Sequence, residues 1–89
     1  MDNGDASKGR RIQAVEISCE LLTALERFNS AGVSELAAEL GRSKATVHSH
    51  LATLLDQEFV VKQGTEYALS LRFVELGEHA KSGVDIHDI

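Results

Sequence analysis

The chain has 89 residues, of which 43% are hydrophobic and 26% charged, and proline is absent. A chain this short builds one small core, so we expect a single domain. No apolar run approaches the roughly 18 residues that cross a bilayer, and the first residues lack signal-peptide features, so we expect a cytoplasmic protein without a membrane partner. The net charge of −5 argues by itself against nucleic-acid binding, because nucleic-acid-binding surfaces are usually basic.

The first segment, residues 1–9, is polar and aperiodic and runs into the pair Arg10-Arg11, which predicts a flexible, basic-ended arm over residues 1–11. Residues 12–28 contain good helix formers and no glycine, and a turn sequence follows them, so they are expected to form a helix. Apolar residues cover more than half of its circumference. Either the domain surrounds this helix, or part of its apolar stripe is a dimer interface formed by Val15, Cys19 and Leu22.

Two further helices are expected in the middle of the chain. In the first, Ser34 is predicted to be the N-cap and Gly41 the left-handed stop. In the second, Ser43 caps a helix from Lys44 to about Gln57, whose apolar positions are Val47, Leu51, Leu54 and Leu55. Two short helices joined by a glycine-containing turn, with an amphipathic second helix, are typical of a helix-turn-helix.

The last part of the chain is expected to hold a hairpin and a helix. Residues 59–63 and 66–70 are β-prone runs separated by Gly64-Thr65, where Gly64 supplies the positive φ of a hairpin turn. A helix over residues 71–80 keeps Phe73, Val74, Leu76 and Ala80 for packing, and residues 81–89 break away from it. The fold class is therefore mainly α with a small β-hairpin: a winged helix-turn-helix over residues 12–80, with a three-helix core, a two-stranded wing and a C-terminal helix.

The charges are distributed unevenly along this pattern. Residues 40–55 contain no acid, whereas the first two helices carry glutamate at positions 16, 20, 26, 35 and 39 against one cation, Arg27. The sequence therefore predicts an acidic back behind a neutral-to-basic face. A surplus of carboxylates with few lysines is also typical of salt-adapted proteins, in which high salt screens the repulsion.

Polar residues that leave the apolar stripe of the third helix are candidates for contacts with double-stranded DNA. Lysine and arginine suit phosphate oxygens, hydroxyl and imidazole groups suit phosphates or base edges, and small methyl groups suit the thymine methyl. The candidates are Arg10 and Arg11 on the arm, Arg42, Ser43, Lys44, Ala45, Thr46, His48, Ser49 and Thr53 at the third helix, and Lys62, Gln63 and Gly64 at the hairpin tip. The competing interpretation is an ordinary solvated surface, which is strongest for the isolated Lys62.

Residues 34–55 resemble the N-terminal DNA-binding domain of IclR-type transcriptional regulators, whose recognition helix opens with a similar Lys-Ser-Thr-Val-His pattern. Residues 44–48 match that pattern, with Ala45 where the family usually has serine, and residues 60–69 and 71–80 resemble the wing and the helix that follows it. The likeness spans about residues 11–89. It implies sequence-specific DNA binding, with the recognition helix over residues 44–57 in the major groove and the hairpin over residues 59–70 as the wing.

The sequence differs from the family pattern at two positions, and the resemblance implies two further properties of the protein. Ser49 stands where many members have arginine, which removes a phosphate or guanine contact, and Glu58 replaces the glycine common before the wing, which predicts a different junction. Family members dimerise, so a homodimer on a pseudo-palindromic operator is expected. Residues 81–89 resemble the start of a linker helix, and a small-molecule effector is expected only if an additional C-terminal domain exists.

Other function classes are disfavoured by what the sequence contains. There is no glycine-rich phosphate loop and no nucleophile elbow, and Cys19 has no histidine beside it, so no enzyme and no cofactor are predicted. His48 and His50 lie about 200° apart around a helix and cannot share an ion, so no metal site is predicted. The net acidity leaves one alternative, a winged helix that binds another protein without direct DNA binding.

Overall fold

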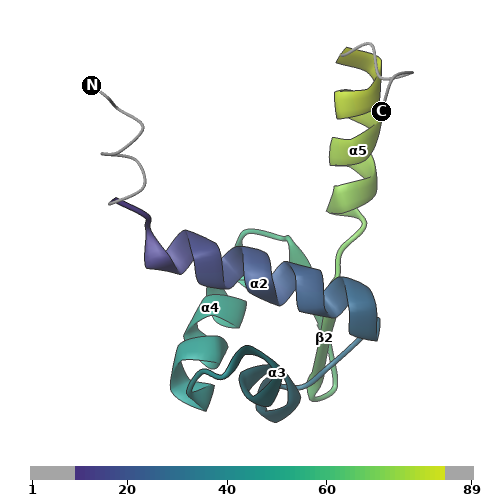
Figure 1. Cartoon of the computed structure of the whole chain (residues 1–89). Helices are drawn as coiled ribbons and strands as arrows, with labels where there is room; N and C mark the ends of the chain where they lie inside the picture. Colours follow the sequence, from purple (N-terminus) through teal and green to yellow (C-terminus); the bar gives the residue numbers. More distant parts are fainter. Residues whose placement is uncertain (1–9, 84–89) are drawn as a thin grey trace.

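The computed structural model describes residues 10–83, which form four helices and one two-stranded antiparallel sheet (Figure 1). The helices are α2 (Gln13–Phe28), α3 (Val33–Leu40), α4 (Lys44–Asp56) and α5 (Arg72–Gly83), and the strands are β1 (Val60–Gln63) and β2 (Glu66–Leu69). This arrangement confirms the predicted fold class. Residues 1–9 of the expected arm and residues 84–89 of the expected linker lie outside the described residues. Within the described part of the chain, no helix is both long enough and apolar enough to span a membrane.

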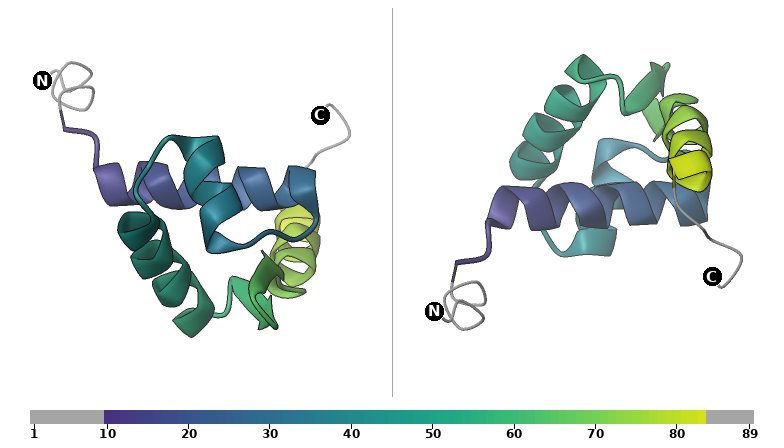
Figure 2. Two further views of the ribbon diagram at one scale, coloured as in Figure 1. Left: turned by 90° about the horizontal axis from the view of Figure 1, so that it is seen from below. Right: turned by 90° about the horizontal axis from the view of Figure 1, so that it is seen from above.

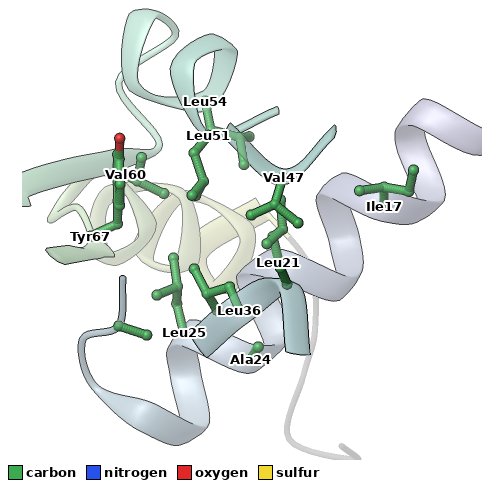
Figure 3. Packing of buried hydrophobic residues seen from close by; sticks show 12 residues of the cluster. Ile17, Leu21, Ala24, Leu25, Leu36, Val47, Leu51, Leu54, Val60 and Tyr67 are labelled. Atoms are coloured by element: carbon green, nitrogen blue, oxygen red, sulfur yellow. The ribbon is translucent and has the colours of Figure 1, made fainter. Parts of the chain in front are cut away.

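The core lies where α2, α3 and α4 meet the hairpin (Figure 3). Each of the three helices contributes a leucine that is completely buried: Leu21, Leu36 and Leu51. The strands close the remaining side with Val60 and Tyr67, which are 2% and 3% exposed. The remaining buried members are Ile17, Ala24, Leu25, Ala31, Ala37, Val47 and Leu54. The predicted apolar face of the third helix is therefore confirmed at Val47, Leu51 and Leu54, whereas Leu55 is 38% exposed.

The hairpin is tied to the loop between α2 and α3. Ala31 forms an isolated antiparallel bridge with Tyr67, in which each backbone N–H donates to the other residue's carbonyl, at 3.0 and 2.8 Å. The chain turns immediately after this bridge, and α3 begins at Val33 with Gly32 as its N-cap. The prediction of Ser34 as N-cap was therefore wrong, because a long-range backbone pairing sets where the helix starts.

The predicted left-handed glycines and the predicted N-cap of α4 are confirmed. Gly41 ends α3 in the left-handed region with φ 65°, and Gly64 has φ 63° in the hairpin turn. The Ser43 side chain accepts a hydrogen bond from the backbone N–H of Thr46, which makes Ser43 the N-cap of α4 as expected. The orientation of α4 relative to the preceding turn is thus set by residues that are close together in the sequence.

Helix α5 projects away from α3 and α4 (Figure 1) and contains no buried residue. It continues to Gly83, three residues beyond the predicted end. Its contact with the body of the domain includes Phe73, whose ring centroid lies 5.4 Å from that of Phe59. The expected packing of Val74 and Leu76 is not found, because these residues are 58% and 43% exposed.

The junction between α4 and the wing stores backbone strain at Glu58. Its φ is 68°, so this glutamate adopts a left-handed conformation that favours glycine. Glu58→Gly should therefore raise the free energy of unfolding by about 0.5–1 kcal/mol, because relief of strain exceeds the added freedom of the unfolded chain. Urea unfolding measures this change. In the same loop, Gln57 has φ −86°, so Gln57→Gly should lower stability, and an equal gain from both variants would contradict the strain argument.

Candidate nucleic-acid interface

One side of α4 is exposed and polar, opposite the buried side formed by Val47, Leu51 and Leu54. Its exposed residues are Lys44, Ala45, His48, Ser49, Ala52, Thr53 and Asp56, with the exposed Leu55 at its edge. The hydroxyl of Thr53 donates to the backbone carbonyl of Ser49 at 3.1 Å, so this hydroxyl is already used within the helix. The cation and the hydroxyl and imidazole groups that remain available on this surface are therefore concentrated in the first half of α4, whereas an acid, Asp56, lies at its end.

The first turn of α4 is built by a pair of hydroxyls. Ser43 Oγ accepts from the Thr46 backbone N–H at 3.1 Å and donates to Thr46 Oγ1 at 3.0 Å. Thr46 is half-buried, unlike the outward position expected from its place on the helix. Ser43 and Thr46 thus position the turn that carries Lys44 and Ala45, and the exposed Lys44 side chain stands at the helix start.

The wing lies on the same side of α2 as α4 (Figure 2). An open groove joins the two elements, and both His48 of α4 and Lys62 of β1 line it. The Lys62 ammonium lies 5.6 Å from the ring centroid of Tyr67, its partner across the hairpin. Gln63 and Gly64 are exposed at the tip. The structure therefore brings the candidate residues of the recognition helix and the wing to one face.

Two carboxylates line this same groove, and sequence reasoning missed both of them. Glu35 comes from the first turn of α3, and Glu66 from the start of β2. The hydroxyl of Ser30 donates to Glu66 Oε1 at 2.7 Å, which orients that carboxylate. The groove face is consequently less basic than the predicted acid-free strip, and the assignment of Glu35 to an acidic back was wrong, because α3 turns its N-terminus toward the wing.

Two of the remaining candidate cations, Arg42 and Arg11, occur in ion pairs with glutamates of α2. Arg42 Nη2 lies 3.7 Å from Glu20 Oε1, and Arg11 Nη1 lies 3.8 Å from Glu16 Oε2. Arg10 and Arg11 are at the beginning of α2, the end of that helix far from the hairpin (Figures 1 and 2). These three arginines are therefore not gathered with His48 and Lys62 in the groove.

The predicted dimer residues on α2 divide into two environments. Val15 is 57% exposed and Cys19 is exposed, and both line a shallow apolar hollow at the start of α2 together with Ile12. Leu22 is partly buried and packs against the core instead. Ile12, which is 66% exposed, extends the apolar hollow and was not among the predicted residues.

The histidines of α4 differ in their surroundings. His48 is exposed toward the groove, whereas the half-buried His50 has Nδ1 2.8 Å from the Thr46 carbonyl oxygen. This contact assigns the Nδ1 proton to His50 as a donor, which leaves Nε2 as a buried acceptor without a partner among the described residues. Residues 10–83 contain no group of three or more histidine, cysteine or acidic side chains arranged to hold a metal ion.

Comparisons with known proteins place this architecture in a family. The model of the IclR helix-turn-helix domain matches residues 14–64, which include α3, α4 and β1. The chain belongs to the IclR helix-turn-helix family. The solved IclR transcriptional regulator from Alicyclobacillus acidocaldarius superimposes on 89% of the chain and 33% of its own length, with a TM-score of 0.82 at 24% identity. That likeness confirms the fold of an IclR winged helix.

Curated relatives of the IclR domain are described as transcriptional regulators. The chain is 32% identical over 90 residues to the "Probable HTH-type transcriptional regulator ArcR" of Halobacterium salinarum, covering 98% of this chain and 34% of the relative. It is 34% identical over 68 residues to the HTH-type transcriptional regulator KdgR of Escherichia coli, covering 74% of this chain and 26% of the relative. The chain therefore spans about a third or less of the length of these relatives.

Proposed function

We propose that the chain is the sequence-specific DNA-binding domain of a transcriptional regulator. The observation that carries this proposal is the common face of α4 and the wing, where His48 and Lys62 line one groove and the exposed Lys44 precedes His48 by one helical turn. Helix α4 would enter the major groove with its first half, and the wing would reach the adjacent backbone or minor groove. Direct readout falls to Ala45, His48 and Ser49, since these exposed side chains stand on the outward side of α4.

The proposal also covers the oligomeric state, the phosphate contacts and the cellular location of the protein. Two copies would bind a pseudo-palindromic operator, and the apolar hollow with Ile12, Val15 and Cys19 supports a contact between copies. Arg10 would hold a phosphate, and Arg11 and Arg42 would do so after leaving Glu16 and Glu20. We expect a cytoplasmic protein without catalytic activity, and response to a small-molecule effector only where a further C-terminal domain is present.

Binding through phosphates predicts a steep dependence on salt. The full chain is titrated into a labelled duplex, enriched by selection from a random library, and the affinity is followed by fluorescence anisotropy at several salt concentrations. Lys44→Ala should weaken binding several-fold and reduce the slope of log K against log salt by about 0.9, because one phosphate contact is lost. Lys81→Ala, which removes an exposed cation from the last turn of α5, should change neither.

A second candidate function, docking of another protein to the winged helix without DNA, is favoured by Glu35 and Glu66 in the groove. These carboxylates oppose phosphate approach and suit a basic protein surface. The same titration separates the two functions. Absence of any enriched duplex, or affinity that does not change with salt, would overturn DNA binding and favour the protein-docking alternative.

A further inference from the structure

Arg42 occupies a fixed backbone position at the entrance to α4. The left-handed Gly41 precedes it, its own N–H donates to the Ala37 carbonyl at 3.0 Å, and the N-cap Ser43 follows. Its backbone is therefore held by the helix-turn-helix itself. Only the Arg42 side chain can therefore change its partner.

In the structure, the Arg42 side chain pairs with a glutamate of α2. Its guanidinium lies 3.7 Å from Glu20 Oε1, with Arg42 27% and Glu20 48% exposed. A solvent-accessible pair at this distance contributes little to stability, since screening and side-chain entropy offset most of the Coulomb attraction. A phosphate, in contrast, offers a guanidinium two-pronged, charge-assisted hydrogen bonds. The exchange of Glu20 for a phosphate is thus energetically accessible.

We propose that Glu20 is a positioning residue that competes with a DNA phosphate for Arg42. In the free protein Glu20 holds the guanidinium against α2, and on binding Arg42 leaves Glu20 and pairs with the backbone beside the first turn of α4. The inference rests on the proposed function. It assigns to α2, which contributes no predicted base contact, a direct influence on DNA affinity.

The chain contains a matched comparison for this competition. Glu39 of α3 accepts a hydrogen bond from Arg27 of α2, and Glu20 and Glu39 line the same shallow hollow between these helices. Substituting either glutamate by glutamine removes one negative charge from nearly the same place. Only the Glu20 variant releases Arg42, so the pair of variants separates the release of Arg42 from the change in net charge.

The test uses the full chain and a labelled random-sequence DNA duplex, with anisotropy titrations across salt concentrations. Glu20→Gln should raise the affinity for DNA about two- to fivefold at low salt. It should also steepen the slope of log K against log salt by up to about 0.9, because the charge of Arg42 is no longer neutralised by Glu20 before the DNA binds. Glu39→Gln should change affinity much less. In the Arg42→Ala background, Glu20→Gln should raise affinity no more than Glu39→Gln does, and thermal unfolding of every variant verifies that it is folded.

The outcomes distinguish this inference from the proposed function. If the wild-type chain binds the duplex but Glu20→Gln leaves affinity unchanged, or raises it no more than Glu39→Gln does, the competition is overturned and Glu20 is only a contact between α2 and the turn. A gain above that of Glu39→Gln that persists after Arg42→Ala overturns it as well. If the folded wild-type chain binds no duplex at any salt concentration, the proposed function fails and the inference falls with it.

Discussion

Leu51→Ala should remove about 3 kcal/mol from the free energy of unfolding, which is a large share of the stability of a small domain. Leu51 is completely buried in the cluster where α4 meets the other two core helices and the hairpin (Figure 3). Truncation leaves a cavity that few neighbours can fill, because the surrounding core is only a dozen residues in size. In thermal unfolding, the midpoint should fall by more than about 10 °C.

The control for this loss is a leucine of the same chain outside the core. Leu71 is 81% exposed, so Leu71→Ala should change stability by less than about 0.5 kcal/mol. Circular dichroism during heating, at several protein concentrations, measures both variants. A small effect of Leu51→Ala, or equal effects of the two substitutions, would show that contacts outside the described core hold α4 in place.

The parts of this domain that sequence reasoning predicted are those governed by neighbouring residues. The Ser43 cap, the left-handed glycines at 41 and 64, and the spacing of Val47, Leu51 and Leu54 are all short-range patterns, and the structure confirms them. Each pattern places a helix start, a turn or a buried face without reference to the rest of the chain. Together they were sufficient to predict the fold class and the exposed side of α4.

The features that sequence reasoning missed depend on pairs of residues far apart in the chain. The Ala31–Tyr67 bridge sets the start of α3, and the Ser30–Glu66 contact orients a carboxylate in the groove. A helical wheel assigns Glu35 to an exposed side but does not specify which neighbour that side faces. Residue patterns therefore located the candidate interface, whereas its charge balance required the three-dimensional pairing of the wing with the loop that precedes α3.

The two carboxylates of the groove are expected to lower its affinity for DNA. Replacing Glu35 and Glu66 together by glutamine should raise the affinity for a labelled duplex about ten- to thirtyfold at low salt. Both carboxylates line the groove between α4 and the wing, where a phosphate at about 4 Å would be repelled by about 1 kcal/mol per carboxylate even at the dielectric constant of water. Glutamine retains an oxygen that can accept from Ser30, so the wing contact at Glu66 survives. The gain should shrink as salt rises, because screening weakens the repulsion.

A double substitution on α5 tests whether position or net charge produces this gain. Glu75→Gln with Glu78→Gln also removes two negative charges, but from α5, which contributes no residue to the lining of the groove, and it should raise affinity much less. Equal gains from both doubles would mean that only the total charge matters. A loss of affinity for the selected duplex, with none for a random one, would instead assign a base-reading role to the groove carboxylates, since carboxylates accept hydrogen bonds from the cytosine amino group.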